Sequence, residues 1–162
     1  MIVRTSSLAG EYVYIDERDP ALDTPHESKM DAWREQYDRA MEQGDIASLP
    51  LKNGNRPVLW RFRHLTADEI VWIVDRVANT RAQMTGNLDI VALSLISVVG
   101  ATTEQGQPFE LKRAPDPTRN GFSTVDRSCL DAILRGEDGR FDGALLSRLA
   151  NRVWRELSPR NG

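Results

Sequence analysis

The segment 58–69 constrains the fold most, because it changes from a strand pattern to a helix start within a few residues. In its first half apolar and basic side chains alternate, so that Trp60 and Phe62 share one face of a predicted strand. Thr66 and Glu69 then have the spacing of a capping box, in which each side chain accepts a hydrogen bond from the other residue's backbone N–H. A strand that leads directly into a helix indicates a mixed α+β chain.

Apolar residues recur at helical spacing along much of the remaining chain, separated by Gly and Pro. The predicted helices span 27–43, 66–84, 88–99, 124–134 and 142–157. Short strands are expected at 11–16, 58–63 and 107–112, with the last able to pair with 58–63. The helix after Thr66 is expected to bury Ile70, Ile73, Val74 and Val77. The predicted class is therefore α+β and predominantly helical, with about five helices, a small antiparallel β element and an extended N-terminal arm.

The chain is expected to have three parts. Residues 1–26 form the arm, 27–56 form a helix followed by a linker rich in turn residues, and 57–162 form a compact helix-rich core. The strand pattern in the arm is too short to bury much apolar surface alone. It therefore needs a neighbour, which is either the same chain or another one.

Composition narrows the class of protein. Among 162 residues, 40% are hydrophobic and 28% are charged, which is typical of a globular domain. The net charge of −3 argues against a nucleic-acid-binding protein. Cys129 is the one cysteine, so no intramolecular disulfide can form and a reducing compartment is expected. No apolar run has the length of a membrane span, so no membrane association is predicted.

The sequence offers little for catalysis or metal binding. It has two histidines, and His26 lies in a proline-rich segment while His64 lies among arginines. A zinc-protease helix would need a second histidine at position 30, where the chain has Met30. Cys129 lacks a partner at ligand spacing and fits a buried apolar position. We therefore expect no catalytic residue, no cofactor and no metal, and the chain is not expected to be an enzyme.

Aromatic and arginine side chains are the better candidates for function, because Trp and Arg are preferred anchors of protein interfaces. Trp72 and Trp154 lie off the main apolar faces of their helices, and nearby arginines complete a candidate partner-binding surface. The alternative to partner binding is that Trp72 and Trp154 pack in a second layer of the core. For Trp33 the alternative is packing in the main core. The candidate partner-binding residues are Tyr12, Tyr14, Trp33, Trp72, Trp154, Arg148, Arg152 and Arg155. The three arginines could instead bind an anion, or only complement the helix dipole.

The order of these elements is similar to that of a known family. The matching features are the strand and capped helix at 60–69, the apolar helix and Gly turn at 92–108, and the closing pair at 130–134 and 145–158. Residues 57–158 thereby resemble the small tail-assembly chaperones of tailed bacteriophages. The resemblance covers about two thirds of the chain and contains no catalytic motif.

The resemblance implies a non-enzymatic protein that coats the tape-measure protein and helps tail-tube subunits to assemble. Its expected partners are phage tail or virion proteins, and its expected location is the host cytoplasm during assembly, or the virion. The N-terminal 56 residues depart from the family pattern. They favour an alternative, a structural virion component such as a connector or capsid-associated protein that forms homo-oligomers through its arm.

Overall fold

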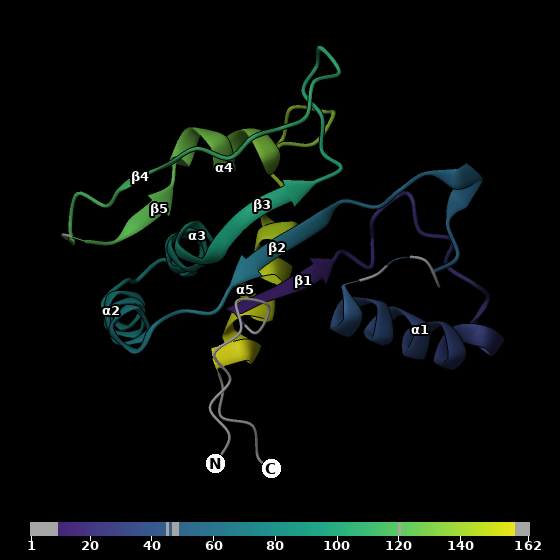
Figure 1. Ribbon diagram of the computed structural model, residues 1–162, viewed down its shortest axis with the longest axis horizontal. Helices are drawn as coiled ribbons and strands as arrows, with labels where there is room; N and C mark the ends of the chain where they lie inside the picture. The colour runs from purple at the N-terminus through teal and green to yellow at the C-terminus, as the bar shows by residue number, and fades with distance from the viewer. Residues whose placement is uncertain (1–9, 45, 47–48, 120, 158–162) are drawn as a thin grey trace. The chain divides into compact units, whose positions relative to one another are not determined.

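The computed structural model describes residues 10–44, 46, 49–119 and 121–157, and Figure 1 shows the arrangement of their elements. The α-helices are α1 (Met30–Gln43), α2 (Ala67–Ala78), α3 (Gln83–Ser94), α4 (Arg127–Ile133) and α5 (Gly143–Leu157). The strands are β1 (Glu11–Ile15), β2 (Leu59–Arg63), β3 (Leu95–Val99), β4 (Arg113–Pro115) and β5 (Ser123–Val125). Short 3-10 turns, η2 (Glu27–Lys29) and η3 (Lys52–Gly54), complete the list. The predicted α+β class is confirmed.

The strands form two small sheets. One has the strand order β1-β2-β3, so the strand expected in the arm is present and lies beside β2. The other is the antiparallel pair β4 and β5, in which Arg113 lies opposite Val125 and Pro115 lies opposite Ser123. The arm therefore has a neighbour in its own chain.

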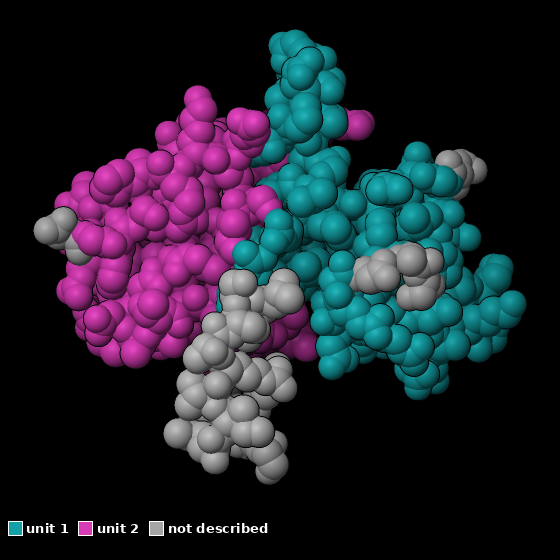
Figure 2. All heavy atoms as spheres, in the orientation of Figure 1, with its two compact units in different colours: residues 1–61, 98–109 teal, residues 62–97, 110–162 magenta. Residues whose placement is uncertain are grey.

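The chain divides into two compact units, coloured separately in Figure 2. Unit 1 comprises residues 1–61 and 98–109, and unit 2 comprises residues 62–97 and 110–162. The predicted arm (1–26) and the predicted helix and linker (27–56) belong to unit 1. The predicted core (57–162) contributes to both units.

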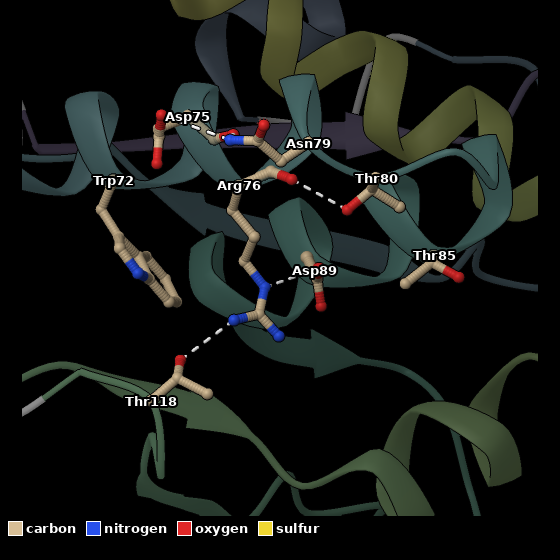
Figure 3. Close-up of a pocket in the computed structure, with 8 residues that line it drawn as sticks. All are labelled: Trp72, Asp75, Arg76, Asn79, Thr80, Thr85, Asp89 and Thr118. Carbon is tan, nitrogen blue, oxygen red and sulfur yellow. Dashed lines mark hydrogen bonds and ion pairs between the residues drawn. The ribbon is translucent and has the colours of Figure 1, made fainter.

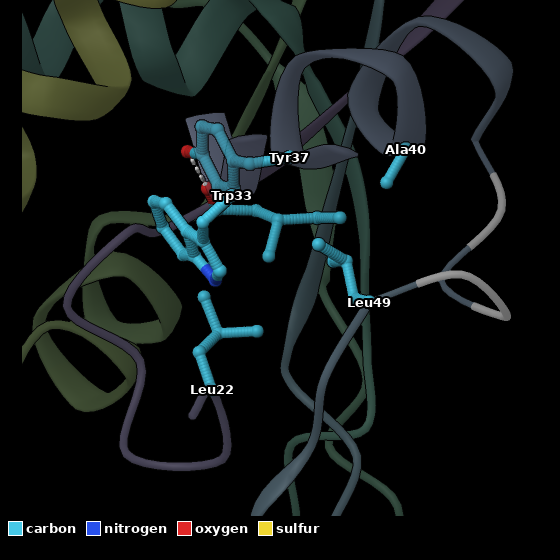
Figure 4. Packing of buried hydrophobic residues seen from close by; sticks show 6 residues of the cluster. Leu22, Trp33, Tyr37, Ala40 and Leu49 are labelled. Carbon is cyan, nitrogen blue, oxygen red and sulfur yellow. Dashed lines mark hydrogen bonds between the residues drawn. The ribbon is translucent and has the colours of Figure 1, made fainter. Parts of the chain in front are cut away.

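Unit 1 is built around the apolar face of α1, which the sequence predicts. Trp33, Tyr37 and Ala40 are buried and pack with Ile15 and Leu49 (Figure 4). The rings of Trp33 and Tyr37 stack with their centroids 5.2 Å apart. The Tyr37 hydroxyl donates to the main-chain oxygen of Ile15, and burial raises the pKa of Tyr37. These contacts fix the arm strand β1 against α1.

Unit 2 is organised around α3, whose residues 89–94 are all buried. Helices α2, α4 and α5 each pack on α3. The longest of these, α5, buries Leu146, Leu149 and Val153 along one stripe, as its spacing predicts. The capping box of Thr66 and Glu69 is present at the start of α2, which confirms that prediction.

The predicted helix 88–99 is wrong at both ends. The helix begins earlier, at Gln83, and it ends at Ser94, where the chain continues directly as strand β3. The main-chain oxygen of Leu93 accepts hydrogen bonds from Arg63 and Arg113, and that of Leu95 accepts one from Arg113. Because arginines occupy these carbonyl groups, the helix can end without a glycine, and the β-branched residues that follow favour a strand.

Other boundaries also differ from the predictions. Residues 27–29 form the 3-10 turn η2, so α1 begins at Met30 and not at 27. Helix α2 ends at Ala78 and not near residue 84, and the Thr80 hydroxyl donates to the main-chain oxygen of Arg76 just beyond that end. The strand expected at 107–112 is absent among the described residues there, and β4 begins at Arg113. The expected pairing with 58–63 is also wrong, since β2 lies between β1 and β3. Helix α4 begins at Arg127 and not at 124, because residues 123–125 form β5; its cap is Asp126, which accepts from the N–H of Ser128.

Candidate functional site

Helix α2 carries apolar side chains on the side that faces solvent. Val71 is 69% exposed and Val74 is 47% exposed, whereas Ile73 on the opposite side is fully buried. Ala67 and Ala78 are also exposed. Positions 67, 71, 74 and 78 follow the helical period and form a single stripe. We call this stripe the outer face of α2.

Two aspartates border the outer face along one side. Asp68 and Asp75 are exposed and lie seven residues apart, so they share one line along α2, which we call the acidic ridge. Within the described residues neither carboxylate makes an ion pair, and Asp75 accepts from the side-chain amide of Asn79 at 3.4 Å. By contrast, Glu69 and Asp89 in the same unit are both bound by arginine.

Several of these side chains do not favour the helix that holds them. Exposed valine is less favourable in a helix than alanine by about 0.5 kcal/mol, because branching at Cβ restricts its rotamers. Asp68 lies in the first turn, where a negative charge complements the helix dipole. Asp75 lies in the last turn, where the same dipole opposes a carboxylate. The presence of Asp68 is therefore explained by its stabilising effect on the helix. The presence of Val71, Val74 and Asp75 is not, because each of them disfavours the helix.

A cleft of about 380 Å³ lies beside the acidic ridge, and its lining includes Trp72, Arg76, Asp89 and Thr118 (Figure 3). Nε of Arg76 donates to Oδ2 of Asp89 at 2.8 Å, and Nη1 donates to Oγ1 of Thr118 at 3.0 Å. The guanidinium also lies 5.4 Å from the ring centroid of Trp72. Asp89 and Thr118 thus hold the Arg76 side chain within unit 2.

Asp89 is the buried charge at this cleft, with 4% of its surface exposed. Arg127 binds its second carboxylate oxygen, so the carboxylate joins α3 to both α2 and α4. Each oxygen of the Asp89 carboxylate therefore accepts a charge-assisted hydrogen bond from a guanidinium. We interpret this cluster as a structural clamp.

The loop after β4 supplies the other wall of the cleft. Oδ1 of Asp116 accepts from the backbone N–H of Thr118 at 2.8 Å and from its hydroxyl at 2.5 Å. Burial disfavours the Asp116 carboxylate, but the hydrogen bonds from Thr118 outweigh burial and lower its pKa. Phe122 in the same loop packs edge-on against Trp72, with the ring centroids 5.3 Å apart.

The predicted partner-binding residues lie in three places. Tyr12, Tyr14 and Trp33 belong to unit 1, where Tyr14 and Trp33 are only 8% and 4% exposed. Trp72 lies on α2 and packs on Phe122. The remaining four share α5; Trp154, Arg148 and Arg152 are half-buried, Arg155 is exposed, and Arg152 pairs with Glu156. The structure therefore places the arginines and Trp154 on one helix and Trp72 on another, and an interface role for these residues stays a prediction.

The outer face of α2 was not predicted as a surface. The sequence assigns Val74 to the buried stripe of this helix, and that assignment is wrong, since Val74 is 47% exposed. The spacing of residues 67, 71, 74 and 78 contains the missing signal. A helix with apolar residues on two adjoining stripes has more apolar surface than one neighbour can cover.

The histidines and the cysteine are not among the residues of the outer face of α2. His26 and His64 are exposed, and Cys129 is half-buried in α4 rather than fully buried as expected. No cluster of three or more His, Cys, Asp or Glu side chains in the described part of the chain could hold a metal ion. Nor is any helix there long and apolar enough to span a bilayer.

Comparisons with family models, with curated proteins and with solved structures give no match for this chain.

Proposed function

We propose that this protein is a non-enzymatic assembly chaperone of a tailed bacteriophage, which binds other phage proteins through the outer face of α2. One observation carries the proposal: Val71 and Val74 are 69% and 47% exposed on a single helix face. Contiguous exposed apolar surface is a common feature of protein-binding sites. The resemblance of residues 57–158 to tail-assembly chaperones supplies the class of partner.

The remainder of unit 2 supports a role in binding rather than catalysis. Its buried carboxylates, Glu69 and Asp89, are both bound by arginine, and the cleft beside α2 is lined by groups that bind one another. Such an arrangement gives a firm scaffold beneath the exposed helix. We expect the protein to act in the host cytoplasm while particles are being built.

Mass spectrometry of purified particles and of infected-cell extracts tests this function. A chaperone is expected to co-purify with phage tail proteins from extracts and to be missing from finished particles. Its presence in particles at a fixed copy number would contradict the chaperone role. That result would identify the alternative, a structural virion component.

A further inference from the structure

We infer that the outer face of α2 binds an amphipathic helix of a different protein, and that this helix carries lysine or arginine along one side. The inference rests on the proposed function, because it names the chemistry of the partner that this surface would hold. Its experiments use the full chain and defined peptides, so they can fail while the assembly role stands.

The shape of the surface favours a helical partner. The stripe from Ala67 to Ala78 covers twelve residues of one helix, and a helix rises about 1.5 Å per residue. Its apolar positions are separated by four, three and four residues, which is the spacing through which two helices interlock. A stripe about 17 Å long offers room for two to three turns of a second helix.

The acidic ridge favours a basic partner. Asp68 and Asp75 lie on the same border of the stripe, and no arginine or lysine pairs with either one in the described residues. Side chains that flank an apolar seam between helices commonly pair with opposite charges across it. Positive charge along the facing side of the partner would complete these pairs. It would also offset the unfavourable position of Asp75 in the last turn.

The same ridge disfavours a second copy of this chain as the partner. When two identical helices pack antiparallel, the same flank of each faces its counterpart, so the ridge of one copy would meet that of the other. A parallel pair would place the ridge against Ile70 and Val77, which border the stripe on its other side and offer no cation. Neither arrangement places a positive charge opposite Asp68 and Asp75.

Isothermal titration calorimetry with two synthetic helical peptides tests the inference. Both peptides carry one leucine and alanine stripe of about three turns, matched to the length of the outer face, and they differ in having lysine or glutamate along one flank. The lysine peptide is expected to bind at least tenfold more tightly than the glutamate peptide, and added salt should reduce the difference. Equal binding of the two peptides, or binding of neither, would overturn the inference.

Variants locate the binding to α2. Val71→Ala with Val74→Ala is expected to weaken binding of the lysine peptide about tenfold or more, because methyl groups that become buried in the complex are lost. Val99→Ala is the matched control, since Val99 is 46% exposed but lies on β3. If the control weakens binding as much as the α2 variant, the peptide does not bind at the outer face.

Charge reversal on the acidic ridge tests whether the ridge itself, and not the net charge of the protein, sets the preference between the two peptides. Asp68→Lys with Asp75→Lys is expected to reverse the preference, so that the glutamate peptide binds more tightly than the lysine peptide. Glu104→Lys with Glu110→Lys changes the net charge equally at two exposed positions outside α2, and should leave the preference unchanged. A preference that follows net charge in both variants would contradict a role for the ridge. If all of these variants still co-purify with tail proteins, the assembly role stands but the partner does not bind at the outer face of α2.

Discussion

Arg113 donates from Nη2 to the main-chain oxygen of Leu93 at 2.9 Å, at the point where helix α3 becomes strand β3. The same guanidinium donates to the main-chain oxygen of Leu95. The carbonyl group of Leu93 lies in the last turn of the helix, which leaves it without an internal partner, and that of Leu95 belongs to the first residue of β3; one side chain binds both. Burial, followed by the nearby charge of Arg63, lowers the pKa of Arg113.

Replacing Arg113 by methionine should destabilise the protein by about 2 kcal/mol, because charge-assisted hydrogen bonds to buried carbonyl groups are lost. Arg113→Lys should reduce stability by nearly as much, since an ammonium group lacks the planar set of N–H donors with which a guanidinium binds two acceptors at once. Urea unfolding measures both. Arg140→Met, at an exposed position, is the control and should change stability little. Equal effects of Arg113→Met and Arg140→Met would contradict this role.

Replacing Asp89 by alanine should destabilise the protein by about 3 kcal/mol or more, because two guanidiniums lose the carboxylate between them. Arg127→Met should cost less, since that side chain is half exposed and Asp89 keeps Arg76. Thermal unfolding of the two variants checks this order. A loss below about 1 kcal/mol for Asp89→Ala would show that the cluster is not a structural clamp.

Glu69 should make stability sensitive to acid. Burial disfavours its carboxylate, but hydrogen bonds from Arg63 and from the backbone of Thr66 outweigh burial and lower the pKa of Glu69. The stabilisation is therefore complete above the pKa of an unfolded glutamate, about 4.3, and is lost as the pH falls through the lower folded value. Glu69→Gln should be less stable than wild type at pH 7 by about 1 to 2 kcal/mol. The difference in unfolding free energy between Glu69→Gln and wild type should become smaller toward about pH 3. A difference that stays constant with pH would contradict this role of the Glu69 carboxylate.

Val71 and Asp75 should be dispensable for folding. Val71→Ala is expected to raise stability by about 0.5 kcal/mol through better helix propensity. Asp75→Asn should raise stability by about 0.3 to 1 kcal/mol by removing a charge that the helix dipole opposes. Denaturant unfolding measures both changes. A loss above about 1 kcal/mol in either variant would mean that the side chain packs within the fold, and the outer face would no longer be a free surface.

Local patterns in the sequence predict much of the fold. The capping box at Thr66 and the stripes of α1 and α5 depend on neighbours three or four residues away, so they are visible in the sequence. The end of α3 depends on Arg113, which lies 20 residues from Leu93, and no local pattern contains that contact. A buried apolar segment is also ambiguous, because helix and strand periods cannot be told apart when all sides are covered.

The candidate site was harder to predict for a related reason. The tryptophans are conspicuous in the sequence, yet Trp33 is core and Trp72 packs on Phe122. The outer face of α2 consists of small aliphatic residues, and the sequence pattern assigns one of them, Val74, to the buried stripe. Only the packing of α2 on α3 decides which of its two apolar stripes is covered.

Site-specific photo-crosslinking from position 71 tests most directly whether the outer face of α2 contacts another protein. The probe is placed at Val71, and separately at Val99, in cells that naturally make the protein. The expected result is an adduct from position 71 that maps to a different protein, in a helical segment with lysine or arginine along one side of its apolar stripe. An adduct from position 71 no stronger than that from position 99, or one only to a second copy of this chain, would contradict it.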